Sequence, residues 1–313
     1  MRARWILIPA LLAASVPCAG AAELGTYAGA GCTGVKHVDA FTHWFGAKPQ
    51  RMLDFFAYDS WSGMVSEARW ATKCWQGTGY RMTFSVPMLP GDHVSTLALG
   101  AAGDYDHYFR DIAQDIVAAG FPDAVIRIGW EFNGGWYPWA AKQDPANWVT
   151  MWRRIVTAMR SVPGQHFQFD WNPTWGMQQI EPTKVYPGDA FVDVIGVDTY
   201  NATWEKSTLE PGPRWQSFVD APYGLKWQAD FAASHGKKLS MPEWGTGTRP
   251  DGHGPGDDPY FVAEMAKWLH ARDVLYHDYW NYDAPDYRAR LDDGQFPKSA
   301  QAFLQSFGAR AQP

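Results

Sequence analysis

Eight short apolar runs with strand character recur along the chain, separated by segments with helical spacing. We expect strands over 34–37, 51–58, 80–86, 124–130, 166–171, 192–199, 238–241 and 276–280. Eight strands that alternate with helices predict an α/β fold, a single (β/α)₈ TIM barrel whose active site lies at the C-terminal ends of the strands. A doubly wound open sheet is the structural alternative. The first expected strand is not followed by a glycine-rich phosphate loop, which disfavours that alternative.

The segments between the strands carry signals for helix starts and stops. Asp144-Pro145 and Asp258-Pro259 each read as an N-cap followed by the first helical residue, and apolar residues at helical spacing come after both. A third helix is expected over 104–120, where a glycine ends it. These helices are long enough to cover the strands of a barrel.

The first 22 residues have the organisation of a secretory signal peptide. Arg2 and Arg4 precede an apolar run, and Ala19-Gly20-Ala21 fits the small-residue cleavage pattern. The apolar run is too short to span a bilayer. We therefore expect a secreted or periplasmic protein, with a catalytic domain over 23–313 and no membrane association once the signal is removed.

Two cysteines, Cys32 and Cys74, remain after the predicted cleavage. An even number of cysteines in an exported protein favours a disulfide, and two buried free thiols are the alternative.

The charge balance limits the partners. Removal of residues 1–22 takes away two arginines and no acids, so 27 basic against 33 acidic residues becomes 25 against 33, and the net charge moves from −6 to −8. An acidic surface argues against nucleic acid or an anionic membrane as partner. The chain also lacks a G-x-S-x-G elbow and a P-loop, which disfavours esterase and phosphoryl-transfer chemistry.

The most informative residues are two glutamates at expected strand ends. Glu131 ends the fourth expected strand and opens onto 132–139, and Glu243 ends the seventh and opens onto Trp244-Gly245. Paired carboxyl groups flanked by aromatic residues are what glycosidic bond cleavage requires. One must be protonated to assist the leaving oxygen, and the other must be ionised to attack or to activate water.

Strand alternation predicts which side chains share the barrel interior with these glutamates. Glu131 should face inward with Arg127 and Gly129, and Glu243 with Leu239 and Met241. We expect Arg127 to be a structural charge paired with Asp170 or another inward acid, since buried charges need partners. By the same count the inward polar and aromatic side chains of the other strands include Gln168, Asp170, Asn172, Asp198, Tyr200, Tyr276, Asp278 and Trp280.

Aromatic residues make up 16% of the chain, with 18 Trp. Many must be core, because tryptophan buries a large apolar area. Those in loops at strand ends can instead stack on sugar rings. Trp136, Tyr137 and Trp139 lie beside Gly134-Gly135 and Pro138, which favours a shaped loop next to Glu131 over a local core. His253 lies in a loop without metal-ligand spacing, so a solvated loop is expected there.

Three stretches, 127–139, 194–200 and 242–245, resemble glycoside hydrolase family 26, typified by β-mannanases. The resemblance implies a (β/α)₈ barrel with the acid/base, Glu131, on the fourth strand and the nucleophile, Glu243, on the seventh. It also implies that Tyr200 hydrogen-bonds the nucleophile, that Asp198 helps to shape the sugar site, and that Trp136 and Trp280 are stacking platforms.

One position departs from the family pattern. The family usually has histidine just before the acid/base, and this chain has Trp130, whose indole can donate one hydrogen bond but cannot accept one. The change leaves the catalytic pair untouched and puts mannose specificity in doubt. The full set of expected substrate-binding residues is Trp130, Asn133, Trp136, Tyr137, Trp139, Asn172, Asp198, Tyr200, Trp244 and Trp280.

The resulting hypothesis is a monomeric, retaining, endo-acting hydrolase of a β-linked polysaccharide, with β-1,4-mannan as the first choice and no metal or organic cofactor. Retention predicts carboxyl groups about 5–5.5 Å apart. Two alternatives stay open. Either the same mechanism acts on another β-glycan, such as a β-glucan, a xylan or a bacterial exopolysaccharide, or the chain is a carbohydrate-binding barrel without catalysis.

Overall fold

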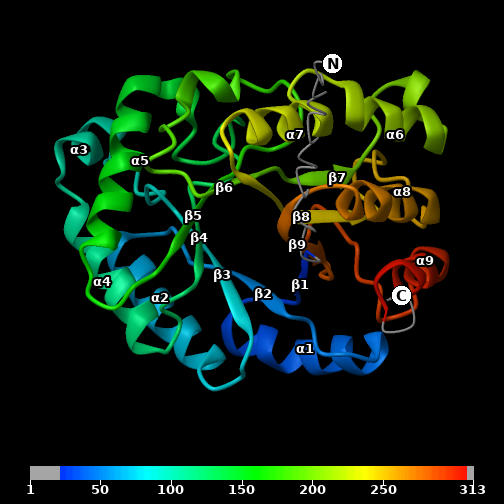
Figure 1. Ribbon diagram of the computed structural model, residues 1–313, viewed down its shortest axis with the longest axis horizontal. Helices are drawn as coiled ribbons and strands as arrows, with labels where there is room; N and C mark the ends of the chain where they lie inside the picture. Colours follow the sequence, from blue (N-terminus) through cyan, green and yellow to red (C-terminus); the bar gives the residue numbers. More distant parts are fainter. Residues whose placement is uncertain (1–21, 309–313) are drawn as a thin grey trace, which may run out of the picture.

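Parallel strands form a closed ring at the centre of the structure, a computed structural model that describes residues 22–308 (Figure 1). The strands are β1 (Glu23–Tyr27), β2 (Arg51–Phe55), β3 (Arg81–Val86), β4 (Val125–Ile128), β5 (Gln168–Trp171), β6 (Val194–Gly196), β7 (Thr199–Asn201), β8 (Lys238–Thr246) and β9 (Val274–Trp280). Neighbours pair in sequence from β1 to β6, and β1 also pairs with β9. Both β6 and β7 pair with β8, so they share one position and the ring has eight. The predicted (β/α)₈ barrel is confirmed.

Helices surround the ring (Figure 1). They are α1 (Gly31–Phe45), α2 (Trp61–Trp75), α3 (Leu97–Ala102), α4 (Asp106–Ala118), α5 (Pro145–Arg160), α6 (Pro211–Asp220), α7 (Leu225–Ser234), α8 (Pro259–His270) and α9 (Pro297–Phe307), with short 3₁₀ turns at Ala141–Gln143, Pro182–Val185 and Lys206–Thr208. The expected caps form: Asp144 accepts from the Asn147 amide, and Asp258 accepts from the Tyr260 and Phe261 amides. Within residues 22–308 no helix is long and apolar enough to cross a membrane.

The first strand lies elsewhere than the sequence predicted. Residues 34–37 belong to α1, whose buried residues Gly34, Val38 and Phe41 recur at helical spacing and pack toward the sheet. The true first strand is β1, directly after the predicted cleavage site. Gly25 within it has no room for a side chain, because a Cβ there would lie 1.7 Å from the Asp278 carboxylate. The predicted signal peptide itself lies almost wholly outside the described residues.

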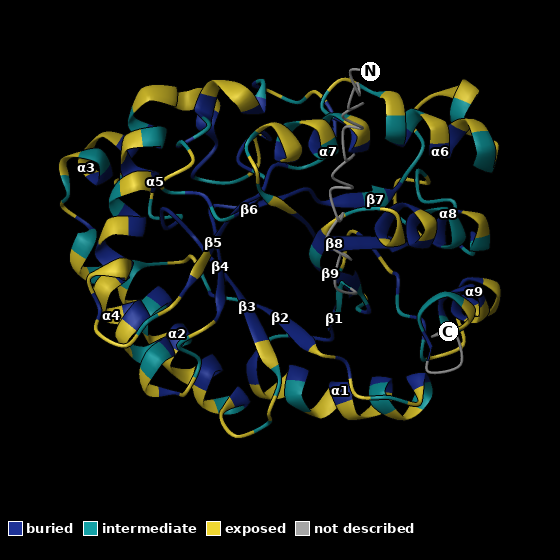
Figure 2. Cartoon of the chain, in the orientation of Figure 1, coloured by how far each residue is buried: buried dark blue, intermediate teal, exposed yellow. Residues whose placement is uncertain are grey.

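The apolar core lies mainly between the ring and its helices, where buried side chains from both layers form one continuous cluster (Figure 2). The barrel interior is different. Its apolar part is a small group made by Val125, Val194 and Tyr276. Charged and polar side chains occupy much of the rest of the interior, with Arg127 and Asp170 fully buried. These polar side chains are continuous with the candidate active site at the mouth of the barrel.

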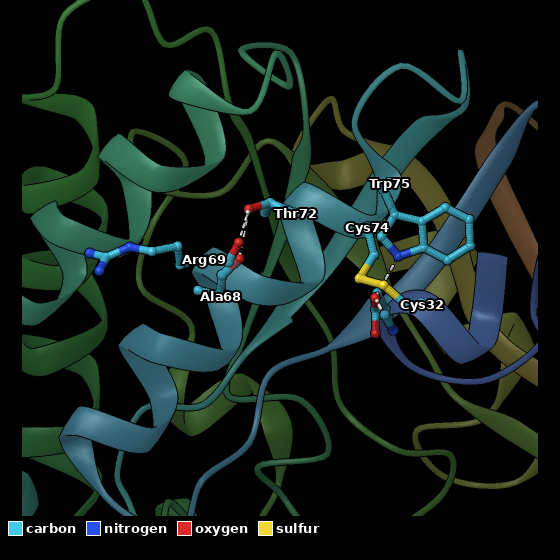
Figure 3. The surroundings of a disulfide bond; sticks show 8 residues. Cys32, Ala68, Arg69, Thr72, Cys74 and Trp75 are labelled. Carbon is cyan, nitrogen blue, oxygen red and sulfur yellow. Dashed lines mark hydrogen bonds between the residues drawn. A yellow bond between two sulfur atoms is a disulfide. The ribbon is translucent and has the colours of Figure 1, made fainter.

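A disulfide joins Cys32 in α1 to Cys74 in α2 (Figure 3). Close to it, the Trp75 indole donates to the Asp54 carboxylate, and so does the backbone amide of Gly31. The bond therefore links the first two helices beside the ends of β1 and β2, at the rim of the barrel.

Replacing both cysteines with serine should lower the free energy of unfolding by about 4 kcal/mol, since the closed loop spans 42 residues and the loss of the cross-link frees the unfolded chain. Urea unfolding of wild type and the double variant would measure this. Equal midpoints and slopes would show that the bridge does not constrain the unfolded chain as expected.

Candidate active site

Glu131 lies just beyond the end of β4, in a turn rather than in the strand. The strand ends at Ile128, and the next residues turn outward with φ of 54° at Gly129 and 53° at Glu131. A Cβ on Gly129 would lie 2.5 Å from Met88, so glycine is needed there. Glu131 occupies a left-handed conformation that is unfavourable for a residue with a side chain. Its amide donates to the Asn172 carbonyl at 2.8 Å, which holds this conformation.

Glu243 faces the interior because β8 is irregular. Ser240 points inward and donates to Asp170, whereas Met241 packs in the cluster outside the ring. Pairing with β9 slips between Met241 and Trp244, an extra-residue bulge that turns Glu243 inward. The prediction that Glu243 shares its face with Leu239 and Met241 is therefore wrong, because it assumed a regular strand.

Arg127 is the buried cation of the site. Its guanidinium lies 2.6 Å from Glu243, contacts Asp198, and also donates to Asn172 and to Ser85. Burial lowers the pKa of Arg127, but the charges of Asp198 and Glu243 more than offset this and raise it. Arg127 is therefore paired with buried acids, as expected, and its partners are Asp198 and Glu243. Asp170 instead accepts from Ser240 and Tyr276.

Tyr200 completes the surroundings of Glu243. Its hydroxyl donates to the second Glu243 oxygen at 2.6 Å, while Arg127 occupies the first. One neighbour contacts Glu243 as a cation and the other as a hydrogen-bond donor. Together they fix the orientation of the Glu243 carboxyl group.

Glu131 has a contrasting environment. Burial raises its pKa to about 7, and the negative charge of Glu243 adds to the rise. Arg127 and hydrogen bonds from Trp136 and Thr174 act in the opposite direction. The Trp136 indole donates to Glu131 Oε2 at 2.9 Å. A carboxyl group with this pKa keeps a substantial protonated fraction at neutral pH, as a general acid requires.

A cavity of about 580 Å³ opens beside Glu243 at the mouth of the barrel. Three expected sugar-binding residues line it: Trp130, Tyr137 and Trp280. The remaining lining residues are Tyr27, Ala30, Phe55, Phe56, Ala57, Tyr58, Asp59 and Glu67. Its size and concavity suit a small ligand or part of a polymer.

Most of this wall was missed by sequence reasoning. Tyr27 ends β1, the strand that was placed too late in the chain, so it was not considered. Phe55 ends β2 and Tyr58 lies three residues beyond it, in the part of the expected strand over 51–58 that carries no polar residue after Asp54. The alternation of inward positions through Phe55 was the available signal.

The other expected substrate-binding residues have different positions. Trp136 is 54% exposed and lies next to Glu131. Asn172 and Asp198 are buried in contact with Arg127. Asn133 and Trp139 are fully buried behind the site, where Asn133 bonds Thr174 and the Trp139 indole donates to the Trp130 carbonyl.

Trp244 lies on the outer side of β8. It is fully buried and packs against Phe261 of α8 and Phe303 of α9. The bulge that turns Glu243 inward turns Trp244 outward, so its expected contact with sugar is corrected to a core role. Within residues 22–308 no group of three or more His, Cys, Asp or Glu side chains is placed to hold a metal ion.

Comparison with known proteins agrees with this geometry. The model of glycosyl hydrolase family 26 matches residues 109–209, a segment that contains Glu131, Asp198 and Tyr200. The chain is similar to glycoside hydrolase family 26. The resemblance expected from the sequence is confirmed.

Two curated relatives extend this similarity. Endoglucanase H of Acetivibrio thermocellus is 30% identical over 149 residues, 45% of this chain and 16% of that protein. A mannan endo-1,4-β-mannosidase of Bifidobacterium adolescentis is 29% identical over 152 residues, 46% of this chain and 15% of that protein. The matched segment of this family 26-like chain thus spans about a sixth of the length of each curated relative.

Solved structures share the fold. An endo-β-1,4-mannanase double mutant from Cellulomonas fimi has a TM-score of 0.64 at 21% identity, over 90% of this chain and 70% of that one. A family 26 β-mannanase from Bacteroides ovatus has a TM-score of 0.64 at 17% identity, over 91% and 88%. At 17% and 21% identity, these matches show that the chain and the two mannanases share the barrel fold.

Replacing Glu243 with glutamine should lower the pKa of Glu131 below its present value of about 7, because the substitution removes a nearby negative charge. Burial is unchanged, so the pKa should stay above that of an exposed glutamate. Titration followed by ¹³C NMR of the glutamate carboxyl groups would measure both effects.

The matched control is Tyr200→Phe, which keeps the charge of Glu243 and should leave the pKa of Glu131 near 7. An unchanged Glu131 pKa in Glu243→Gln would mean that the two carboxyl groups are not coupled.

Proposed function

We propose that this barrel is a retaining glycoside hydrolase that cleaves a β-linked polysaccharide internally, with β-1,4-mannan as the first choice of substrate. The observation that carries the proposal is the unequal pair of carboxyl groups. Glu243 is ion-paired with Arg127 and accepts from Tyr200, and Glu131 has its pKa raised to about 7. A carboxyl group held by a cation and a hydroxyl donor, together with a second carboxyl group whose pKa is raised, is suited to acid-assisted displacement at a sugar carbon.

In the first step Glu243 attacks the anomeric carbon, and Glu131 gives its proton to the leaving oxygen. In the second step Glu131, now ionised, takes a proton from water, and the water oxygen displaces Glu243. The first step needs protonated Glu131. The value of kcat/KM, whose pH dependence reports the pKa values of the free enzyme, should therefore decline as the pH rises through about 7. Retention requires a carboxyl separation of about 5–5.5 Å, and we propose that value for this pair.

The neighbours of the pair have supporting parts in this proposal. Tyr200 and Arg127 contact the two oxygens of Glu243 and fix its orientation, and Asp198 balances the Arg127 charge. Trp280 and Trp136 offer ring faces to the sugars on either side of the scissile bond.

The choice of sugar rests on weaker support than the chemistry. One relative is named an endoglucanase and the other a mannosidase, at nearly equal identity. Trp130 lines the cavity where the family usually has histidine. A β-glucan, a xylan or a bacterial exopolysaccharide is therefore a competing substrate for the same mechanism.

Hydrolysis of mannan, glucomannan, mixed-linkage glucan, xylan and curdlan by the mature domain tests the proposal. Glu131→Ala should reduce the rate on the preferred glycan by about 10²–10⁴-fold, and Glu243→Ala by at least as much. Glu210→Ala is the matched control, since Glu210 is an exposed glutamate outside the cavity, and it should retain wild-type activity. ¹H NMR of the first product should show the β-anomer.

Formation of the α-anomer first would replace retention with inversion. Hydrolysis at the wild-type rate by both alanine variants would contradict the assignment of Glu131 and Glu243 as the catalytic pair. Binding of a glycan without cleavage, equal in wild type and variants, would favour the non-catalytic barrel.

We also propose that the chain is exported and acts as a monomer in the periplasm or medium. The Cys32–Cys74 disulfide supports an oxidising compartment, because such bonds are rare in the cytosol of most bacteria. Mass spectrometry of the protein recovered from periplasm and medium should give a chain that begins at Glu23. Recovery from the cytosol alone, with residues 1–22 intact, would refute export.

A further inference from the structure

Trp204 is a large apolar side chain that does not contribute to the apolar core of the fold. It follows β7 by three residues and is 59% exposed, the most of any tryptophan in residues 22–308. It does not join the core cluster, unlike the half-buried Trp175 and Trp227. Exposed Trp70 differs as well, because its ring covers the backbone of Gly31, where a Cβ would lie 2.1 Å away.

The indole is nevertheless held in one orientation. The His253 ring stacks on it with centroids 3.9 Å apart and planes 29° from parallel, and the Arg249 guanidinium lies 5.3 Å from its centre. These two residues come from the loop after β8, so the support for Trp204 is provided by a neighbouring loop of the barrel mouth.

Hydrogen bonds fix the two loops to each other. The Thr203 amide donates to the His253 carbonyl at 2.9 Å, and His253 Nδ1 lies 2.7 Å from the Thr203 carbonyl. Asp251 accepts from the His253 amide and pairs with Arg249. The loop that sequence analysis treated as solvated is in fact a support for an exposed indole. Such preorganisation lowers the entropic cost of binding a ligand to the ring.

Trp204 is also within reach of the catalytic residues. It follows Tyr200, which bonds Glu243, by four residues, and four residues extend the chain by at most ~14 Å. In the eight-position ring β2 and β6/β7 are four positions apart in either direction, hence opposite (Figure 1). The cavity residues Tyr58 and Asp59 follow β2, and Trp204 follows β7.

We propose that Trp204 is a remote sugar-binding platform that stacks on a unit of the polysaccharide lying beyond the catalytic cavity. The polymer then crosses the barrel mouth from Tyr58 on the β2 side, over Glu131 and Glu243, to Trp204. This inference rests on the proposed function and adds the site at which long chains are recognised. An indole ring that is supported by a neighbouring loop and still 59% exposed suits stacking on the C–H face of a sugar.

The test compares long and short substrates of whichever glycan the wild type cleaves. Trp204→Ala should raise KM for the polymer on the order of tenfold, the amount expected when one stacking contact is lost. It should leave kcat nearly unchanged, together with kcat/KM for an oligosaccharide too short to reach the platform. Trp204→Phe keeps an aromatic face and should recover most of the loss.

Leu209→Ala is the matched control. Leu209 is 61% exposed in the same connection between β7 and α6, so its truncation should affect neither substrate. Thermal unfolding of each variant checks folding, and the midpoint should not move, because Trp204 lies outside the core cluster.

A second readout separates this inference from the proposed function. Affinity electrophoresis in the polymer, with Glu243→Ala as the background, should show weaker retardation when Trp204→Ala is added. Equal retardation or equal KM would overturn the platform while hydrolysis by wild type left the proposed function intact. A wild type that neither cleaves nor binds any glycan of the panel would overturn both.

Discussion

The buried guanidinium of Arg127 is the interaction on which the rest of this site depends. It lies on β4 and reaches Ser85, Asn172, Asp198 and Glu243, which belong to four other positions of the ring. A buried charge is tolerated only with close partners, and removal of one partner leaves the other uncompensated, at a cost of about 3–5 kcal/mol. The polar interior of the barrel and the candidate active site are therefore a single network.

Two local departures from regular backbone aim the carboxyl groups into that network. Glu131 leaves β4 in a left-handed conformation that its own side chain disfavours, and Glu243 turns inward through a bulge in β8. Irregularities of this kind weaken a strand, and they persist where the surrounding structure holds them in place. Here the backbone bond from Glu131 to Asn172 and the ion pair from Glu243 to Arg127 do so.

These departures also mark the limit of sequence reasoning. Alternation succeeded on β9, where Tyr276 and Asp278 point into the interior and Trp280 reaches the cavity, because that strand is regular over these residues. It failed on β8 because a regular strand was assumed there, although Pro242 lies between Met241 and Trp244, where the register slips, and proline inside a strand is typical of a bulge. It also missed β1: a glycine required by the Asp278 side chain lowers its strand character. The two glutamates proposed as catalytic could be picked out because each stands in a short local motif, whereas the wall of the cavity is assembled from the ends of separate strands.

The composition of that wall explains why the chemistry is better specified than the sugar. Its lining residues are aromatic, small apolar or acidic, and they include no arginine, lysine, histidine, asparagine or glutamine. Ring faces position a pyranose with little regard to which hydroxyl is axial, and carboxylates accept a hydrogen bond from any hydroxyl within reach. Histidine before the acid/base could accept a bond from one hydroxyl, whereas Trp130 contributes a further ring face instead. Under the proposed function, stacking on these rings positions the polysaccharide, while Glu131 and Glu243 carry out the cleavage.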